Sequence, residues 1–395
     1  MLKLINTLTV LTSVFFSAAA YAEFKDFTWG GFLTQGLVHT DGNNFAGESE
    51  NSISTDFREA GIYGLWRPTS HLRLGAQIVA RKLGNLTDDA PQFDYLSADY
   101  SFLNSYDSDF GVRIGKLKVP YGFYNDVREI PFARTSILLP QAMYFDQARD
   151  FQISALGGSL YGFKSFEDYR VEQELLLAQP RKDEVAEYAL LNDDFSGKFE
   201  RSRAVIYRGS LNDVKDRWRL GLTLGDLSLD YAPGANRELG LKNGTINVQF
   251  FVLGAQYNLE KISFTSEYTR HFIDHTDLGG VFLLFGRQTY EAFYLESNYR
   301  LANKWNVFLR YDVVYRDVND RDGKKKEAIF GIPAATQWSK DITLGLGWQA
   351  TQSILLRAEW HHIRGTARAP EQDNRDSERA DGHWNMFLMQ AAYRF

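Results

Sequence analysis

Residues 72–81, Leu-Arg-Leu-Gly-Ala-Gln-Ile-Val-Ala-Arg, carry the pattern that decides the fold of this chain. Beginning with Leu72, every second side chain is apolar, and the positions between them include Arg73, Gln77 and Arg81. Successive side chains of a β-strand point to opposite faces, so the alternation predicts a strand with one apolar and one polar face. The same period of two runs through most of the sequence, which therefore predicts an all-β protein.

Sixteen stretches share this alternation and are predicted to be strands. They lie near residues 27–39, 56–67, 71–83, 93–103, 108–117, 152–163, 169–179, 201–211, 217–229, 245–258, 260–272, 287–301, 304–316, 338–349, 353–363 and 384–395. Short turns alternate with long loops, and the long loops fall near 40–55, 84–92, 118–151, 180–200, 230–244, 273–286, 317–337 and 364–383. That rhythm is typical of an antiparallel barrel with both termini on one side of a membrane. If the pattern splits or merges one hairpin, the count becomes fourteen or eighteen.

The first residues predict export through the periplasm. Lys3 precedes an apolar run over 4–16, and a small-residue A-x-A site follows just before Glu23, the pattern of a cleavable signal peptide. We expect residues 1–22 to be removed and residues 23–395 to form a single barrel domain. The sequence contains no Cys, so no disulfide framework is expected in an oxidising compartment.

The other end of the chain separates two readings of the alternation. A soluble sandwich would show the same period, with its apolar face turned inward. The last strand, however, ends on Phe395 and is similar to the C-terminal signature strand of outer-membrane barrels. This resemblance implies recognition by the barrel-assembly machinery. With the predicted signal peptide, it favours a transmembrane β-barrel in a Gram-negative outer membrane, in contact with the lipid bilayer and lipopolysaccharide.

One predicted loop differs from the others in length and composition. Residues 118–151 form the longest connection, the third long loop, and they contain three prolines and many apolar or aromatic side chains. A loop of this length is usually functional or disordered, and this one is too apolar to be disordered. Its apolar side chains need a surface to pack against, so the sequence predicts that the loop folds into the lumen.

At this loop the chain resembles a known family. Sixteen strands with an inward-folded third external loop resemble the general trimeric porins. The passage Gly115-Lys-Leu-Lys-Val-Pro-Tyr-Gly122 is similar to the G-x-x-K-x-P-x-G passage of the phosphate-selective porins. The resemblance implies a homotrimer whose water-filled pores let ions and small hydrophilic solutes diffuse passively, each pore narrowed by residues 118–151.

The charged residues predict where solutes would be selected. The candidate constriction residues of the loop are Asp126, Arg128, Glu129, Arg134, Asp146 and Arg149. The candidate pore-wall residues, which share the polar parity of their strands, are Arg73, Arg81, Arg113, Arg310, Arg357 and Glu359. Opposed acids and bases across a water channel orient and select solutes. The alternative is that these charges pair locally and hold the loop in place. The mixture also departs from the continuous basic ladder that phosphate specificity would require, so solute identity stays open.

Other function classes find little support in the residues. The net charge of −6 argues against nucleic acid as a partner. No Ser-His-Asp order or G-x-S-x-G motif predicts an enzyme, and no cofactor or metal is expected. His271 and His275 would lie close together on one face only in a helix, so on a strand that runs into a loop we expect them to be surface polar residues rather than a metal pair. The main rival is a closed structural or adhesive barrel that acts through its charged external loops.

Overall fold

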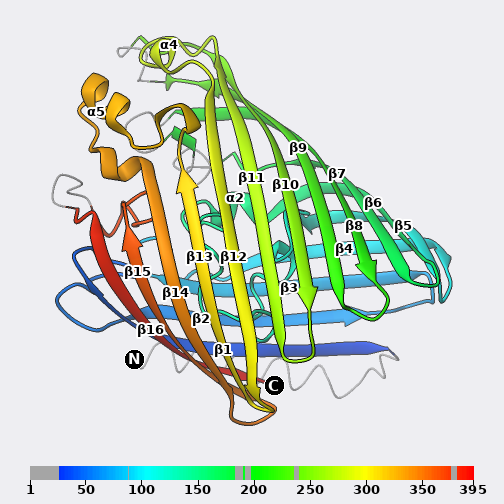
Figure 1. Cartoon of the computed structure of the whole chain (residues 1–395). Coiled ribbons are helices and arrows are strands. Elements are labelled where there is room, and N and C mark those ends of the chain that lie inside the picture. The colour runs from blue at the N-terminus through cyan, green and yellow to red at the C-terminus, as the bar shows by residue number, and fades with distance from the viewer. Residues whose placement is uncertain (1–25, 88, 183–189, 192–196, 235–239, 375–379) are drawn as a thin grey trace, which may run out of the picture.

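The computed structural model describes residues 26–395 apart from 88, 183–189, 192–196, 235–239 and 375–379, and apart from the side chains of 150 and 285. The predicted signal peptide at 1–22 lies outside the described residues. The remainder is one sheet with short helical segments in its connections (Figure 1).

The described part of the chain forms sixteen strands. They are β1 (Phe27–Asp41), β2 (Ser54–Trp66), β3 (Leu72–Leu83), β4 (Gln92–Asn104), β5 (Ser108–Lys118), β6 (Ser154–Ser165), β7 (Tyr169–Gln179), β8 (Lys198–Asp213), β9 (Trp218–Ala232), β10 (Gly244–Asn258), β11 (Ile262–Thr276), β12 (Gln288–Ala302), β13 (Trp305–Tyr315), β14 (Trp338–Gln349), β15 (Ile354–Arg364) and β16 (His383–Arg394). Every predicted strand is present, so the predicted count of sixteen is confirmed.

The sheet closes on itself. Each strand pairs antiparallel with its neighbours in sequence, and β1 pairs with β16 from Phe32 opposite Arg394 to Asp41 opposite Asn385. The terminal residue extends this seam, because the amide and carbonyl of Phe395 each hydrogen-bond to Gly31 at 3.1 Å. A closed barrel has no unpaired strand edge, which is the condition that a β-structure must meet in lipid.

Short helices occupy the long connections. They are η1 (Asn125–Val127), η2 (Pro131–Ala133), α2 (Arg149–Gln152), α4 (Phe282–Phe285), η5 (Val318–Asp320), α5 (Lys324–Phe330) and η6 (Ala334–Gln337). Within the described ranges, no helix has the length and apolar character needed to cross a membrane. Figure 1 shows α4 and α5 at one end of the barrel, opposite the tight hairpin turns.

The distribution of burial along the strands is the reverse of that in a water-soluble protein. On β13, Leu309 and Tyr311 are 54% and 39% exposed, whereas Arg310 and Asp312, which alternate with them, are buried. On β15, Trp360 is exposed while Glu359 and His361 are buried. An outer surface of exposed apolar side chains around a charged interior is typical of a transmembrane β-barrel, because lipid covers the outer face.

Several strands extend further than the alternation predicted, and the longest extensions are at the long-loop end. β11 continues to Thr276, and its pairing with β10 still places Ile246 opposite His275. β8 likewise begins at Lys198. Backbone pairing continues past the apolar band, where the side chains are polar on both faces and the period of two disappears from the sequence.

Candidate functional site

The segment predicted to be special connects β5 to β6 and is largely buried. Ile137, Leu138, Leu139, Met143 and Tyr144 are each at most 3% exposed. The segment contains only the short helices η1, η2 and α2, so its conformation depends on contacts that it makes elsewhere in the barrel.

The first group of contacts centres on Glu267 of β11. Its carboxylate accepts hydrogen bonds from the amide of Phe123 at 2.8 Å, the hydroxyl of Tyr144 at 2.6 Å and the hydroxyl of Tyr294 at 2.8 Å. Glu267 is only 1% exposed, so these three donors replace its hydration. The contacts hold the first turn of the segment and its Tyr144 against β11.

A close approach to Glu267 requires a glycine at position 122. Gly122 has a φ of +58°, in the left-handed region. A Cβ atom there would clash with the hydroxyl of Tyr144 and with the carboxylate of Glu267. The glycine therefore provides both the turn and the space that the backbone needs to reach the strand.

The middle of the segment is held by charged side chains of β13 and β15. Glu359 accepts hydrogen bonds from the amides of Ile137 and Leu138. Arg357 donates to the carbonyl of Ser136 at 2.7 Å, and Arg310 donates to the carbonyl of Leu138 at 3.1 Å. Three predicted wall residues thus satisfy buried backbone groups of the loop, which have no regular secondary structure to pair with.

The third group of contacts involves β2 and β3. Arg81 pairs with Glu59 at 3.0 Å and with Asp146 at 3.1 Å, and Arg134 pairs with Glu59 at 2.9 Å. Arg128 pairs with Asp146 at 3.3 Å and donates to the carbonyl of Tyr144 at 2.7 Å. All of these side chains are at most 8% exposed.

Two loop carboxyl groups remain charged in this buried network. Burial raises the pKa of Asp146, but the positive charges of Arg81 and Arg128 outweigh burial and hold it below its usual range. Burial likewise raises the pKa of Glu129, and the charges of Arg149 and Lys118 outweigh it. Both groups therefore act as fixed anions that hold the loop together.

The other three predicted residues lie in a different, more open cluster. The side chains of Arg73, Arg113 and Asp126 are 34%, 31% and 42% exposed. Arg113 lies 3.2 Å from both Asp99 and Glu174. The other contacts of this open cluster are Arg73 with Asp99 at 3.2 Å, Asp126 with Arg208 at 2.6 Å and Arg208 with Glu174 at 3.1 Å.

The structure therefore divides the predicted site into two sets. Local pairing, the alternative weighed in the sequence analysis, describes the buried set: Arg81, Arg128, Glu129, Arg134, Asp146, Arg149, Arg310, Arg357 and Glu359. Only Arg73, Arg113 and Asp126 are exposed enough to meet a solute directly. Each of these three side chains lies next to one of opposite charge, which is Asp99 for Arg73, Asp99 and Glu174 for Arg113, and Arg208 for Asp126.

Sequence reasoning missed several partners that strand register would have revealed. Glu59 lies directly opposite Arg81, and Glu174 lies opposite Arg208. Asp99 lies between Arg73 and Arg113 on the neighbouring strands. Opposite charges at directly facing positions attract one another, so a correct register alone predicts these pairs.

The prediction for His271 is wrong. The residue is half-buried, the centroid of its ring lies 4.9 Å from that of Tyr290 and 5.3 Å from that of Phe250, and its Nε2 lies 3.3 Å from the hydroxyl of Tyr121. It faces the interior, where aromatic neighbours replace the solvent that we expected. Within the described residues, no group of three His, Asp or Glu side chains could hold a metal ion.

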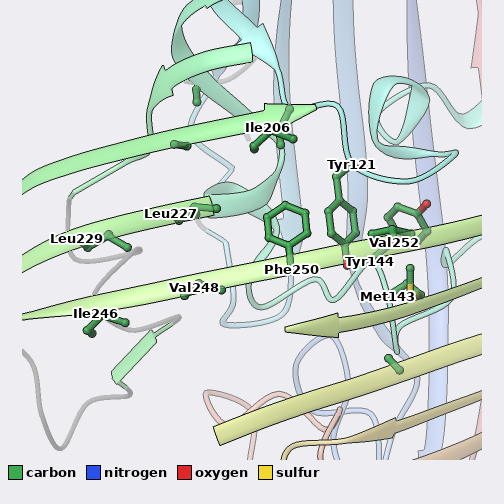
Figure 2. Packing of buried hydrophobic residues seen from close by; sticks show 14 of the residues in the cluster. Tyr121, Met143, Tyr144, Ile206, Leu227, Leu229, Ile246, Val248, Phe250 and Val252 are labelled. Carbon is green, nitrogen blue, oxygen red and sulfur yellow. The ribbon is translucent and has the colours of Figure 1, made fainter. Parts of the chain in front are cut away.

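His271 belongs to an apolar region that the charged lumen predicted from sequence did not include. On the inner face of β7 to β10, Leu176, Ile206, Leu227, Val248 and Phe250 are all buried. Figure 2 shows Tyr121 of the loop beside Phe250, with ring centroids 5.6 Å apart. These residues line part of a cavity of about 400 Å³.

Comparisons with known proteins place the fold. No family model matches the sequence, and no curated protein sequence matches it. Among solved structures, an anion-selective porin from Comamonas acidovorans matches with a TM-score of 0.58 and 14% identity, over 94% of this chain and 99% of that one. The outer membrane channel DcaP of Acinetobacter baumannii matches with a TM-score of 0.57 and 9% identity, over 94% and 97%. OmpT of Vibrio cholerae matches with a TM-score of 0.55 and 12% identity, over 93% and 97%.

These matches extend over nearly the full length of each chain. The chain therefore has the porin-like fold, a closed antiparallel barrel of sixteen strands in its described residues. At such low sequence identity the likeness concerns the fold, and the function has to be argued from this chain's own residues.

Proposed function

We propose that this chain is a porin of the Gram-negative outer membrane, which lets small hydrophilic solutes and ions diffuse passively through a water-filled pore. Residues 118–151 would fold into the lumen and constrict that pore. The observation that carries the proposal is the set of loop contacts with Glu59, Arg81, Glu267, Arg310, Arg357 and Glu359, whose strands lie in different parts of the barrel.

The direction of those wall side chains supports a position inside the barrel. Arg310 is buried between Leu309 and Tyr311, which are exposed on the apolar face. Glu359 and Trp360 show the same relation on β15. A loop held by side chains of the buried, polar parity would lie on the face turned away from lipid.

The open cluster supports the position of the passage. Arg73, Arg113, Arg208, Asp99, Asp126 and Glu174 combine partial exposure with both signs of charge. Solutes would pass between Asp126 on the loop and the strands that carry the other charges. Because both signs alternate there, we propose weak ion selectivity and no dedicated phosphate site.

Assembly and location complete the proposal. Removal of residues 1–22 would leave 23–395 as a single exported barrel, inserted by the assembly machinery through the strand that ends on Phe395 and surrounded by bilayer and lipopolysaccharide. A homotrimer is proposed on the porin-like fold and on one matching OmpT structure that is described as a trimer form. No enzymatic reaction is proposed, because the buried charges hold the loop and those of the open cluster pair with one another.

Single-channel recording tests the proposal. Purified protein in a planar bilayer should give stepwise ohmic currents in KCl, in groups of three if the protein is trimeric. Under a salt gradient the reversal potential should be small, because the open cluster mixes cations and anions. A folded barrel that gives no current would reject the pore and favour the closed barrel that acts through its external loops.

A further inference from the structure

The cavity of about 400 Å³ has the composition of a binding site for an amphipathic anion. Most of its wall is apolar or aromatic, contributed by loop residues such as Tyr121 and Phe145 and by strand residues such as Ile206 and Val248. Its lining also contains three cationic side chains, Arg316, Lys326 and Arg368, and none of the described lining residues is Asp or Glu. A diffusion pore for hydrophilic solutes has no need of such a surface.

Arg368 is the most unusual of the three cations. It is 9% exposed, and it forms no ion pair with a carboxylate of the described residues, although the charge of Asp312 acts on it at longer range. Its Nη2 donates to the hydroxyl of Tyr290 and, at 3.4 Å, to the carbonyl of Ala142, and its Nη1 donates to the carbonyl of Ala367 at 3.3 Å. Its Nε is buried and has no partner among the described residues. A buried arginine normally has an anionic partner, since burying an unpaired charge is costly.

Aromatic rings fix the orientation of this guanidinium. It lies 4.1 Å from the ring centroid of Phe145 and 5.5 Å from that of Tyr290. Such contacts stabilise the cation without neutralising it, so a carboxylate that enters the cavity would meet a positive charge held in a fixed orientation. The neighbouring cations differ, because Arg316 pairs with Glu371 at 3.6 Å and Lys326 donates to Gln337 at 3.1 Å.

The rest of the wall defines the other half of the ligand. The rings of Phe250 and Tyr290 lie tilted against that of His271. Ile206, Leu227 and Val248 continue the apolar surface beside Phe250 (Figure 2). A small aromatic or aliphatic body would displace water from this surface with a gain roughly proportional to the area that it covers.

We propose that this cavity binds small aromatic monocarboxylates, with the carboxylate on Arg368 and the ring against the apolar wall. The inference deepens the proposed pore function and rests on it for access to the lumen. The barrel would then concentrate one class of solute before the open cluster, and would select for it over inorganic anions and neutral aromatics.

Calorimetric titration of the protein in lipid nanodiscs tests this proposal with three probes. Sodium 3-phenylpropanoate carries both recognition elements, 3-phenylpropan-1-ol lacks the charge and acetate lacks the ring. We expect the first to bind roughly tenfold or more tightly than either of the others, because a charge-assisted hydrogen bond in a buried site is worth at least that factor. Equal binding of the three probes, or no binding of the first, would overturn the proposal.

Variants locate the site. Arg368→Gln should reduce the affinity for 3-phenylpropanoate to that for the alcohol, and Arg368→Lys should give an intermediate affinity because it keeps the charge without the fork. Arg364→Gln is the matched control, since Arg364 is exposed and donates to His383 away from the cavity. Unchanged affinity in both Arg368 variants would overturn the assignment.

Current recording separates this inference from the pore itself. The expected result is a KCl current that 3-phenylpropanoate blocks and acetate does not. A normal KCl current without probe binding would reject the cavity site and leave the pore intact. Probe binding by a barrel that carries no current would reject the pore and keep the binding site.

Discussion

The charged residues of this barrel fall into two sets that differ in solvent exposure: buried charges that bind the loop, and partly exposed charges that can act on solutes. Arg310 and Glu359 are buried and bind backbone groups of the loop, so removing either charge would leave unsatisfied groups in the interior. Arg113 and Asp126 are partly exposed, so their charges can act on solutes. Substitution should therefore affect folding in the first set and selectivity in the second.

Arg113→Gln tests the selective set. Removing a partly exposed cation beside Asp99 and Glu174 leaves the passage more negative, so the reversal potential in a KCl gradient should move toward the cation-selective side. Arg217→Gln is the control, because Arg217 lies in a tight turn with its side chain 57% exposed and paired to Asp213. Equal shifts in the two variants would show that Arg113 acts only through net charge.

The acid range tests the buried set. Glu129 and Asp146 have pKa values held below the usual range, so their contribution to stability is complete above their unfolded pKa values, near 4, and is lost as the pH falls below them. Protease resistance of the loop should therefore be constant from pH 7 to about 5 and should weaken below about pH 4. Weakening between pH 7 and 5 would contradict this account. Pepsin and a neutral protease together cover the range.

At the scale of elements, the loop between β5 and β6 depends on one glycine. Gly122→Ala adds a Cβ that clashes with Tyr144 and Glu267 at a left-handed backbone position. We expect a loss of about 2 kcal/mol or more in the free energy of unfolding, and faster tryptic cleavage of the loop.

Gly234→Ala is the matched control for that change. Gly234 has a similar φ of +56°, and a Cβ there would meet no atom of the described residues within 4 Å. The Gly234→Ala variant should therefore lose only the free energy of backbone strain, about 1 kcal/mol, with no added clash. If the two variants lose equal stability, the contact with Glu267 does not anchor the loop.

The strands were predictable from the sequence where one local rule, the alternation of apolar and polar side chains, determines them. Alternation located all sixteen strands of the described chain because a lipid-facing side chain and a lumen-facing side chain must differ in polarity. The apolar inner face of β7 to β10 broke that rule: Leu176 and Ile206 are inward-facing, yet neither is polar. Nothing in the local pattern distinguishes an inward apolar residue that lines a cavity from one that faces lipid.

The candidate site was predictable in its residue types and not in its partners. The loop was identifiable from its length and its apolar content, and the charges around it from their parity. Which charge pairs with which depends on strand register and on the path of the loop, as the contacts of Glu59 with Arg81 and Arg134 show. Strand register and the path of the loop depend on residues far apart in the sequence, so no short stretch of sequence predicts them.

At the scale of the whole molecule, closure between β1 and β16 determines whether the barrel forms. Phe395 makes two backbone hydrogen bonds to Gly31, and its ring lies 6.2 Å from that of Trp29. Deleting Phe395 should reduce the yield of folded barrel, measured by heat-modifiable migration in gels. Phe387→Ala, which removes an exposed ring from the same strand, should have little effect. Equal yields of the deletion variant and the unmodified protein would contradict this role.

The central claim is an open pore constricted by residues 118–151, and a thiol-block experiment tests it most directly. The chain contains no Cys, so Asp126→Cys introduces a single reactive thiol at the proposed constriction. Asp107→Cys places the same thiol in the exposed turn before β5, where Lys164 pairs with the native carboxylate. A bulky charged thiol reagent should reduce the single-channel current of the first variant in steps and leave that of the second unchanged. Currents that are absent, or unaffected in both variants, would contradict the claim.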